Sequence, residues 1–273
     1  MSSSETEANG LPNFDLREEI KEYWGRRAET FDSQPGHEIF SEAERSAWHG
    51  LLLRHLGPGE GRQALDLACG TGVISHLLDD LGFDVSGLDW AEPMLERARA
   101  KARTRQRTIR FVVGDAERTL EPDASADVLT CRHLVWTLVD PPAAFREWLR
   151  ILKPGGRLLI VDGDFVNPGP VARLTAALPA LWRKLFARGA APAIAEQLAT
   201  HRSILARVHF SGGARAEEVA ELLREAGFAD IRVDARLGAI HRAQSRNFPA
   251  LKALDRATQH RYAISAVKPA DET

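Results

Sequence analysis

The chain has 273 residues, of which 44% are hydrophobic and 27% are charged, a composition typical of one globular α/β domain with an appendage. Its formal net charge of -2 gives no overall field that would attract nucleic acid strongly. The two cysteines cannot form a disulfide framework, the polar N-terminus lacks an apolar signal core, and no apolar run could cross a bilayer. We therefore expect a cytoplasmic protein with no membrane span and no nucleic-acid partner.

The first predicted elements are a tail and two helices. Residues 1–15 are rich in Ser, Glu and Asn, which have little to bury, and we expect a disordered tail. Apolar residues at helical spacing predict a helix over Leu16–Phe31 and a second one over Ser41–Leu56, which ends at Gly57.

Beyond these helices, short apolar runs alternate with helical segments of about ten residues. This alternation predicts right-handed crossovers and a parallel sheet. The predicted strands are Gln63–Ala68, Asp84–Leu88, Ile109–Val113, Ala126–Cys131 and Arg157–Asp162, and the helices between them are Gly72–Leu81, Pro93–Arg103 and Pro142–Leu152.

The last third of the chain breaks this rhythm. The proline-punctuated segment Asp164–Phe210 predicts two helices with a turn, and Ala216–Ala226 predicts another helix. Closing strands are predicted at Ile231–Leu237 and Tyr262–Val267, with Ala239–Asp255 between them irregular or helical.

The strongest motif starts at Ala64 and runs from the first predicted strand directly into a helix. Gly70 and Gly72 let the backbone turn sharply and approach a ligand closely, because no Cβ intervenes. A pyrophosphate fingerprint would have a third glycine inside the helix, yet the next glycine is Gly82. Asp66, just before the turn, would repel a pyrophosphate and attract a ligand that carries an ammonium and a sulfonium.

Polar residues follow the next three strands. Asp89 stands at the interval at which a carboxylate meets ribose hydroxyls. Asp115 could accept the amino group of an adenine, while the N–H of Ala116 meets a ring nitrogen. Arg132 and His133 end the fourth strand, so all these residues lie at the carboxyl edge of the sheet, where doubly wound folds bind ligands.

In this order and spacing, five segments resemble the class I S-adenosylmethionine-dependent methyltransferases, with a closer likeness to the ubiquinone/menaquinone-biosynthesis type and its small-molecule relatives. The segments are DLACGTG, GLDWAEPML, GDAE, ADVLTCRHLVWTLVDP and LKPGGRLLI, and the resemblance covers about Tyr23–Asp162. It implies an α/β, Rossmann-like fold: a seven-stranded, mostly parallel sheet with the last strand antiparallel, helices on both faces, an N-terminal helical lid and a helical insertion after the fifth strand. It also implies S-adenosylmethionine as cofactor, S-adenosylhomocysteine as product and a small-molecule methyl acceptor.

With this resemblance, the chain divides into five units. After the tail (1–15) come the lid helices (16–60), the S-adenosylmethionine-binding core (61–163), the insertion that caps the substrate (164–212) and the C-terminal part of the core (213–273).

The predicted site has a cofactor set and one catalytic residue. The predicted cofactor-binding residues are Tyr23, Asp66, Ala68, Gly70, Gly72, Asp89, Trp90, Met94, Asp115, Ala116 and Arg132. Tyr23 either closes over the methionine end or caps the sheet, and Trp90 and Met94 either stack on adenine or pack under a helix. His133 is either a general base with a pKa suited to neutral pH or a structural hydrogen-bonding residue. The histidines show no metal-ligand spacing, and we expect no metal.

Acceptor selection is assigned to the N-terminal helices and to the insertion, where apolar anchors stand beside Arg and His. These residues are Phe165, Leu178, Leu181, Trp182, Phe186 and Leu205, with Arg173, Arg183, Arg202 and His209. The alternative is that the insertion is a dimer interface, and the chain is expected to be a monomer or a homodimer.

Three other functions stay open. An NAD(P)-dependent oxidoreductase is disfavoured by the missing third glycine and by Asp66. A non-catalytic S-adenosylmethionine-binding regulatory protein is disfavoured by the intact set of motifs. An RNA or protein methyltransferase is disfavoured by the near-neutral charge and by the absence of an Asn/Asp-Pro-Pro-Tyr/Phe signature on the fourth strand.

Overall fold

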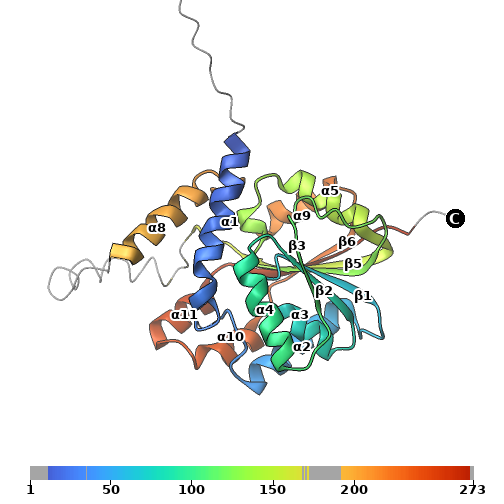
Figure 1. Ribbon diagram of the computed structural model, residues 1–273, viewed down its shortest axis with the longest axis horizontal. Helices are drawn as coiled ribbons and strands as arrows, with labels where there is room; N and C mark the ends of the chain where they lie inside the picture. The colour runs from blue at the N-terminus through green and yellow to red at the C-terminus, as the bar shows by residue number, and fades with distance from the viewer. Residues whose placement is uncertain (1–11, 35, 168, 170, 172–191, 271–273) are drawn as a thin grey trace, which may run out of the picture.

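The structure is a computed structural model that describes residues 12–34, 36–167, 169, 171 and 192–270 (Figure 1). Six residues of the predicted acceptor cap therefore lie outside the described residues, and their assignment stays a prediction. They are Arg173, Leu178, Leu181, Trp182, Arg183 and Phe186.

A seven-stranded sheet in the order β3-β2-β1-β4-β5-β7-β6 forms the centre of the molecule. Strands β1 to β5 pair in parallel, and β7 is antiparallel to both β5 and β6. The expected Rossmann-like sheet is thus confirmed. The strands are β1 (Gln63–Leu67), β2 (Asp84–Asp89), β3 (Arg110–Val113), β4 (Ala126–Arg132), β5 (Leu152–Gly163), β6 (Ala229–Asp234) and β7 (Arg261–Val267).

Helices surround the sheet, and α2 and α5 begin after side-chain caps. Helix α2 begins after Ser41, whose hydroxyl accepts a hydrogen bond from the Glu44 N–H at 3.2 Å. Helix α1 begins at Pro12, inside the stretch predicted as tail, because proline is well suited to the first turn of a helix. The helices are α1 (Pro12–Phe31), α2 (Glu42–Leu56), α3 (Val73–Asp80), α4 (Glu92–Thr104), the 3₁₀ turn η1 (Val135–Thr137), α5 (Pro141–Ile151), α8 (Pro192–Leu205), α9 (Ala216–Glu225), α10 (Gly238–Ser245) and α11 (Ala250–Thr258).

Two hydrophobic layers enclose the sheet, one on each face. Phe145 and Trp148 of α5 are fully buried in the layer that α5 and α9 form with the strands. Trp48 of α2 and Leu78 of α3 lie in the other layer. Because both faces are covered, the inner parallel strands are continuous apolar runs, as the sequence pattern indicates.

Several helices gather at the carboxyl edge of the parallel strands. Figure 1 shows α1 between α4 and α8, with α11 near the end of α1. The loop after α1 approaches α11 closely, since a Cβ on Gly36 would lie 2.7 Å from Nη2 of Arg256. The stretch Ala239–Asp255, expected to be irregular or helical, is mostly helical. Its two helices, α10 and α11, follow β6 and precede β7 along the chain.

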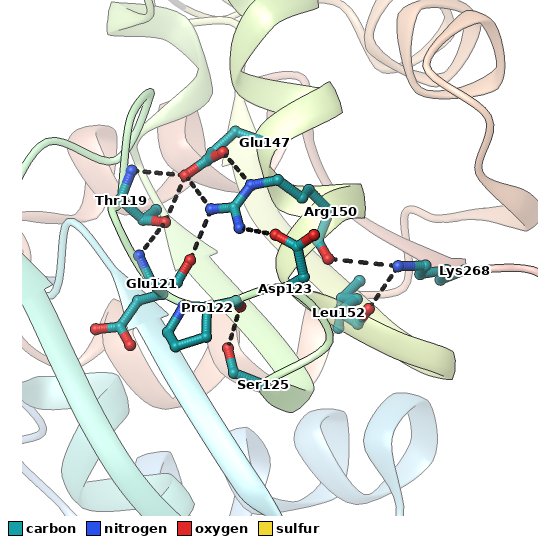
Figure 2. Close-up of polar contacts among 9 residues, drawn as sticks. All are labelled: Thr119, Glu121, Pro122, Asp123, Ser125, Glu147, Arg150, Leu152 and Lys268. Carbon is teal, nitrogen blue, oxygen red and sulfur yellow. Dashed lines mark hydrogen bonds and ion pairs between the residues drawn. The ribbon is translucent and has the colours of Figure 1, made fainter.

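The opposite, amino edge carries a polar network around Glu147 of α5 (Figure 2). Glu147 accepts hydrogen bonds from the N–H and hydroxyl of Thr119, at 2.8 and 2.6 Å, and from Nε of Arg150 at 2.8 Å. Arg150 also binds the carboxylate of Asp123, and its carbonyl accepts a 3.4 Å hydrogen bond from Lys268. The network ties the loop before β4 to α5 and to the residue that follows β7.

Across the described ranges, we find no helix that is both long and apolar enough to span a membrane.

Candidate functional site

A cavity of about 710 Å³ opens at the carboxyl edge of the sheet, under α1. All predicted cofactor-binding residues line it except Gly72, and His133 lines it too. Parallel strands end at the same edge, which explains why motifs far apart in the sequence meet here.

The loop after β1 brings its backbone up to the cavity. Ala68 and Gly70 have φ angles of 49° and 55°, in the left-handed region. A Cβ on Gly70 would meet only a ring carbon of Phe31, at 3.9 Å, so the space above this glycine is open to a ligand.

Gly72 does not line the cavity, contrary to the sequence prediction. Its φ is 80°, and a Cβ here would lie 3.0 Å from the ring of Phe111 and 3.3 Å from Cβ of Ala98. Gly72 therefore serves the turn into α3 and the close packing of that helix start, and its contact with a cofactor stays a prediction.

Two buried carboxylates lie beside this loop. Asp66 is 1% exposed and accepts hydrogen bonds from the hydroxyls of Ser75 at 2.6 Å and Thr130 at 3.1 Å. Asp89 accepts backbone N–H groups from Gly70 at 2.9 Å and Ala91 at 2.8 Å. Burial raises the pKa of both carboxyls to about 6, although these hydrogen bonds oppose the rise. Both carboxylates line the cavity, held in place by these donors.

The predicted adenine end combines apolar and acidic groups. Met94 is buried against Ala28 and Ala91, with Trp90 partly buried beside them. Asp115 accepts the N–H of Glu117 at 2.8 Å, which holds its carboxylate at the cavity rim.

Helix α1 covers the cavity with three neighbouring side chains. The Tyr23 hydroxyl accepts a 2.9 Å hydrogen bond from Arg27 and lies 3.2 Å from Nδ1 of His201. The guanidinium of Arg27 also lies over Trp24, at 5.5 Å from the ring centroid, and its Nε is buried with no partner among the described residues.

His133 stands where β4 ends, in an unusual backbone conformation. Its φ is 58°, which is uncommon for a residue with a Cβ, and its N–H is tied to the carbonyl of Val161 at 3.0 Å. Its ring lies edge-on to Phe165, with centroids 5.2 Å apart. Burial and then the positive charges of Arg132 and Arg261 lower its pKa well below 6.5. The expectation of a pKa suited to neutral pH is therefore wrong for the ligand-free protein, because the sequence did not reveal these charges.

A basic side of the cavity was missed by sequence reasoning. Lys252 and Arg256 from α11 and Arg261 from β7 line the cavity together with Arg132. Lys252, Arg256 and Arg261 lie about 120 residues or more after Arg132, in a stretch without a recognisable motif. Only the topology of the sheet brings them close to Arg132. In the described parts of the chain, no group of three His, Cys, Asp or Glu side chains is placed to hold a metal ion.

Comparisons with known proteins identify the relatives of this chain. A family model described as "Methyltransferase domain" matches residues 65–160. A demethylmenaquinone methyltransferase of Paenarthrobacter aurescens is 31% identical over 217 residues, covering 76% of this chain and 79% of that protein. The enzyme of the same name from Renibacterium salmoninarum is 30% identical over 213 residues, covering 76% and 84%.

Solved structures are similar in fold. The Haemonchus contortus phosphoethanolamine N-methyltransferase 2, in complex with phosphomonomethylethanolamine and S-adenosylhomocysteine, has a TM-score of 0.64 and 17% identity. That match covers 93% of this chain, which spans 60% of the other. The [4+2]-cyclase SpnF has a TM-score of 0.58 and 19% identity, covering 93% of this chain and 96% of that one. At such identities the likeness shows the fold alone, and one fold serves several reactions.

Proposed function

The chain belongs to the class I S-adenosylmethionine-dependent methyltransferases of the quinone-biosynthesis type, and on that premise we propose that it methylates a hydroxylated aromatic ring similar to a naphthoquinol. Methyl transfer to a small-molecule acceptor follows from the family. The acceptor class rests on the demethylmenaquinone methyltransferases among the relatives and on aromatic side chains in the cavity. The observation that carries the proposal is one continuous cavity, which joins the acidic strand ends to Trp136, Phe165 and His133.

The residues at the acidic side fit S-adenosylmethionine. Asp66 and Asp89 present negative carboxylates at the cavity to the ammonium and to the ribose hydroxyls, and the open space over Gly70 admits close approach of the ligand. Arg27, with its unpartnered Nε, supplies a cation for a carboxylate.

The chain's own residues then have three tasks. When bound, S-adenosylmethionine supplies a methyl group on a sulfonium, and the electron pair of the breaking carbon–sulfur bond stays on sulfur in S-adenosylhomocysteine. Trp24 and Trp136 pack edge-on, with centroids 6.1 Å apart, and exclude water from the cavity between α1 and η1. Phe165 and Trp136 hold the acceptor ring in line for the transfer. His133 takes the proton that the acceptor hydroxyl gives up.

Calorimetry tests the cofactor assignment. S-adenosylhomocysteine should bind with a saturable isotherm and NAD should not. Asp89→Ala should weaken binding by roughly 1–3 kcal/mol, the cost of unmade hydrogen bonds to a polar ligand. Asp84→Ala is the matched control, because Asp84 lies exposed at the other end of β2.

Transfer itself is followed with a naphthalenediol and methyl-labelled S-adenosylmethionine. Appearance of the label in the diol is expected. Saturable binding of NAD without S-adenosylhomocysteine would overturn the cofactor assignment, whereas cofactor binding without labelled diol would overturn the acceptor class.

A further inference from the structure

Apart from Arg27 of α1, the charges around the cavity are separated by sign. Acidic side chains line the part over β1, β2 and the turn after β3. They are Asp66, Asp89, Asp115 and Glu117. Basic side chains line the part over β4, α11 and β7, namely Arg132, Lys252, Arg256 and Arg261. The sheet order places β2 and β7 on opposite sides of the β1–β4 pair. The acidic and the basic side chains would therefore face different members of a bound cofactor–acceptor pair.

Three of these residues, Arg132, Arg256 and Arg261, form what we call the arginine cluster. Among the described residues, none of the three has a carboxylate oxygen within 4.0 Å. Their hydrogen bonds go to neutral groups, and those of Arg256 and Arg261 go to the side-chain amides of Gln244 at 3.3 Å and Gln259 at 3.0 Å. Arg132 donates to the carbonyl of His37, and its Nη1 is buried with no partner among these residues.

The nearby carboxylates form no ion pair with the cluster and are hydrogen-bonded elsewhere. Both oxygens of Asp162 accept backbone N–H groups, from Val135 at 2.7 Å and Gly163 at 2.8 Å. Glu44 accepts the side-chain amide of Gln244 at 2.8 Å. Asp255 lies near enough to act on Arg256 and Arg261 through its charge, yet forms an ion pair with neither.

The unpaired charges destabilise one another. Burial and then the charge of Arg256 lower the pKa of Arg261 from 12.5 to about 9. The pKa of Arg256 is lowered by burial and by Arg132. Carboxylates such as Asp66, Glu44 and Asp162 act on the cluster from a distance, but none forms an ion pair with it. Buried guanidinium groups without a paired carboxylate are costly, and an anionic ligand would reduce that cost.

We infer that the arginine cluster binds an oxyanion, a carboxylate or a phosphate, that is attached to the hydroxylated acceptor ring, so that among hydroxylated aromatic rings the preferred acceptor is one that also carries an acid group. This inference rests on the proposed function and specifies its substrate.

The surroundings fit a ring attached to that anion. The guanidinium of Arg261 lies over the ring of Phe165, 5.2 Å from its centroid, and Phe165 in turn lies edge-on to His133 and Trp136. The anion-binding groups, an aromatic wall and the proposed base are therefore contiguous. A planar acid held by the arginines would extend along Phe165 toward His133.

The bound anion would also activate the base. The charges of Arg132 and Arg261 are among the causes that lower the pKa of His133, after burial itself. A negative group between these arginines and the imidazole would offset their repulsion, so His133 would accept a proton more readily when the correct acceptor is present. A neutral acceptor would not provide this offset.

Binding of paired probes to the protein saturated with S-adenosylhomocysteine tests the inference. Naphthoate and naphthamide have nearly the same shape and differ in charge, and naphthyl phosphate adds the second kind of oxyanion. We expect naphthoate or naphthyl phosphate to bind about tenfold or more tighter than naphthamide. The tighter of the two acids identifies the anionic group.

Two single variants locate the preference, Arg256→Gln on α11 and Arg261→Gln on β7. Each should reduce the preference for the acid by about tenfold and leave affinity for S-adenosylhomocysteine unchanged. Arg246→Gln is the matched control, because Arg246 is exposed at the end of α10 and does not line the cavity. Thermal melting establishes whether each variant folds. If Arg261→Gln does not fold, Arg256→Gln alone provides the test.

Equal binding of naphthoate, naphthyl phosphate and naphthamide overturns the inference, as does a preference that survives in both variants. Loss of S-adenosylhomocysteine affinity in both variants would assign the cluster to the cofactor and overturn it too. Failure of the proposed function has a different signature: the wild type would then bind no S-adenosylhomocysteine at all.

Discussion

His133 combines a strained backbone with a neutral ring. At φ 58°, a residue with a Cβ is held in a conformation that asparagine tolerates better than most. Such strain persists at sites where the surrounding structure fixes it, and here the hydrogen bond to Val161 does so. The lowered pKa means that the imidazole is already unprotonated at neutral pH and is free to accept a proton.

This geometry makes His133→Asn a sharper test than alanine. Asparagine suits the backbone but cannot act as a base, so kcat should fall by roughly 10²–10⁴ while affinity for S-adenosylhomocysteine stays within about twofold. Because a lowered pKa moves protonation to more acidic pH, kcat/KM of the wild type should not decline as pH falls from about 8 to 6.5. His49→Ala, at a histidine of α2 that does not line the cavity, is the control. An unchanged kcat in His133→Asn would remove the base assignment.

The sequence revealed the acidic side of the site better than the basic side. Asp66, Asp89 and Asp115 follow strands whose apolar patterns are clear, so their position at one edge could be predicted from chain order. Arg256 and Arg261 could not be found in this way. Nothing local marks them, and their place in the site depends on how α10 and α11 return the chain to the sheet.

At the scale of elements, the amino edge holds an ion-paired network that takes no part in the cavity (Figure 2). Burial alone would raise the pKa of Glu147, but hydrogen bonds from Arg150 and Thr119 outweigh burial and lower it from 4.5 to about 2. The folded state therefore favours the ionised carboxylate. Its contribution to stability is complete above about pH 4.5 and is lost as pH falls toward 2.

We predict that Glu147→Gln lowers the free energy of unfolding by roughly 1.5–3 kcal/mol at neutral pH, the usual cost of losing hydrogen bonds to a charged group. Urea unfolding at several pH values measures it, and the gap from wild type should narrow as pH drops below 4.5. Affinity for S-adenosylhomocysteine should not change. Glu96→Gln, an exposed position in α4, serves as the control. A gap that is independent of pH would show that the charge of Glu147 is not what stabilises the network.

Element types were predictable, whereas several boundaries were not. The strands β1, β2 and β4 agree with their apolar runs within a residue or two, because burial on both faces leaves a strong pattern. Strand β5 starts at Leu152, well before the predicted Arg157, because Lys153, Pro154 and the two following glycines hid its first half. Pairing of Leu152 with Ala126 in β4 overrides that local signal.

On the scale of the whole molecule, α1 lines the cavity and is fixed there by contacts with distant parts of the chain. Arg17 forms a 2.6 Å ion pair with Glu117, and Arg207 beyond α8 forms one with Glu19. Lys101 of α4 forms a 3.1 Å ion pair with Asp32, just after the helix. A ligand of the cavity therefore touches a surface that α1 shares with α4 and α8.

Hydrogen exchange should reveal this coupling. S-adenosylhomocysteine at about one hundred times its Kd stabilises the folded state by about 2.7 kcal/mol. We expect S-adenosylhomocysteine to slow amide exchange most in α1 and in the loops after β1 and β2, which contact the cavity. Residues 119–125 at the amino edge should slow only as far as the global stabilisation requires. Uniform slowing along the chain would contradict this coupling. Amide exchange of the ligand-free protein at rising temperature shows which segments open first without a ligand and serves as the reference.

The sheet order has a further consequence, for how such a protein diversifies. The acidic side of the cavity, the proposed donor side, is built mainly from one uninterrupted stretch, β1 to the turn after β3, whereas the basic side, the proposed acceptor side, draws on β4, α11 and β7. Changes in α10 and α11 would thus alter which molecule is methylated while the donor-binding stretch stays intact. Exchanging these two helices between related chains is accordingly a route to new substrates that leaves the methyl source unchanged.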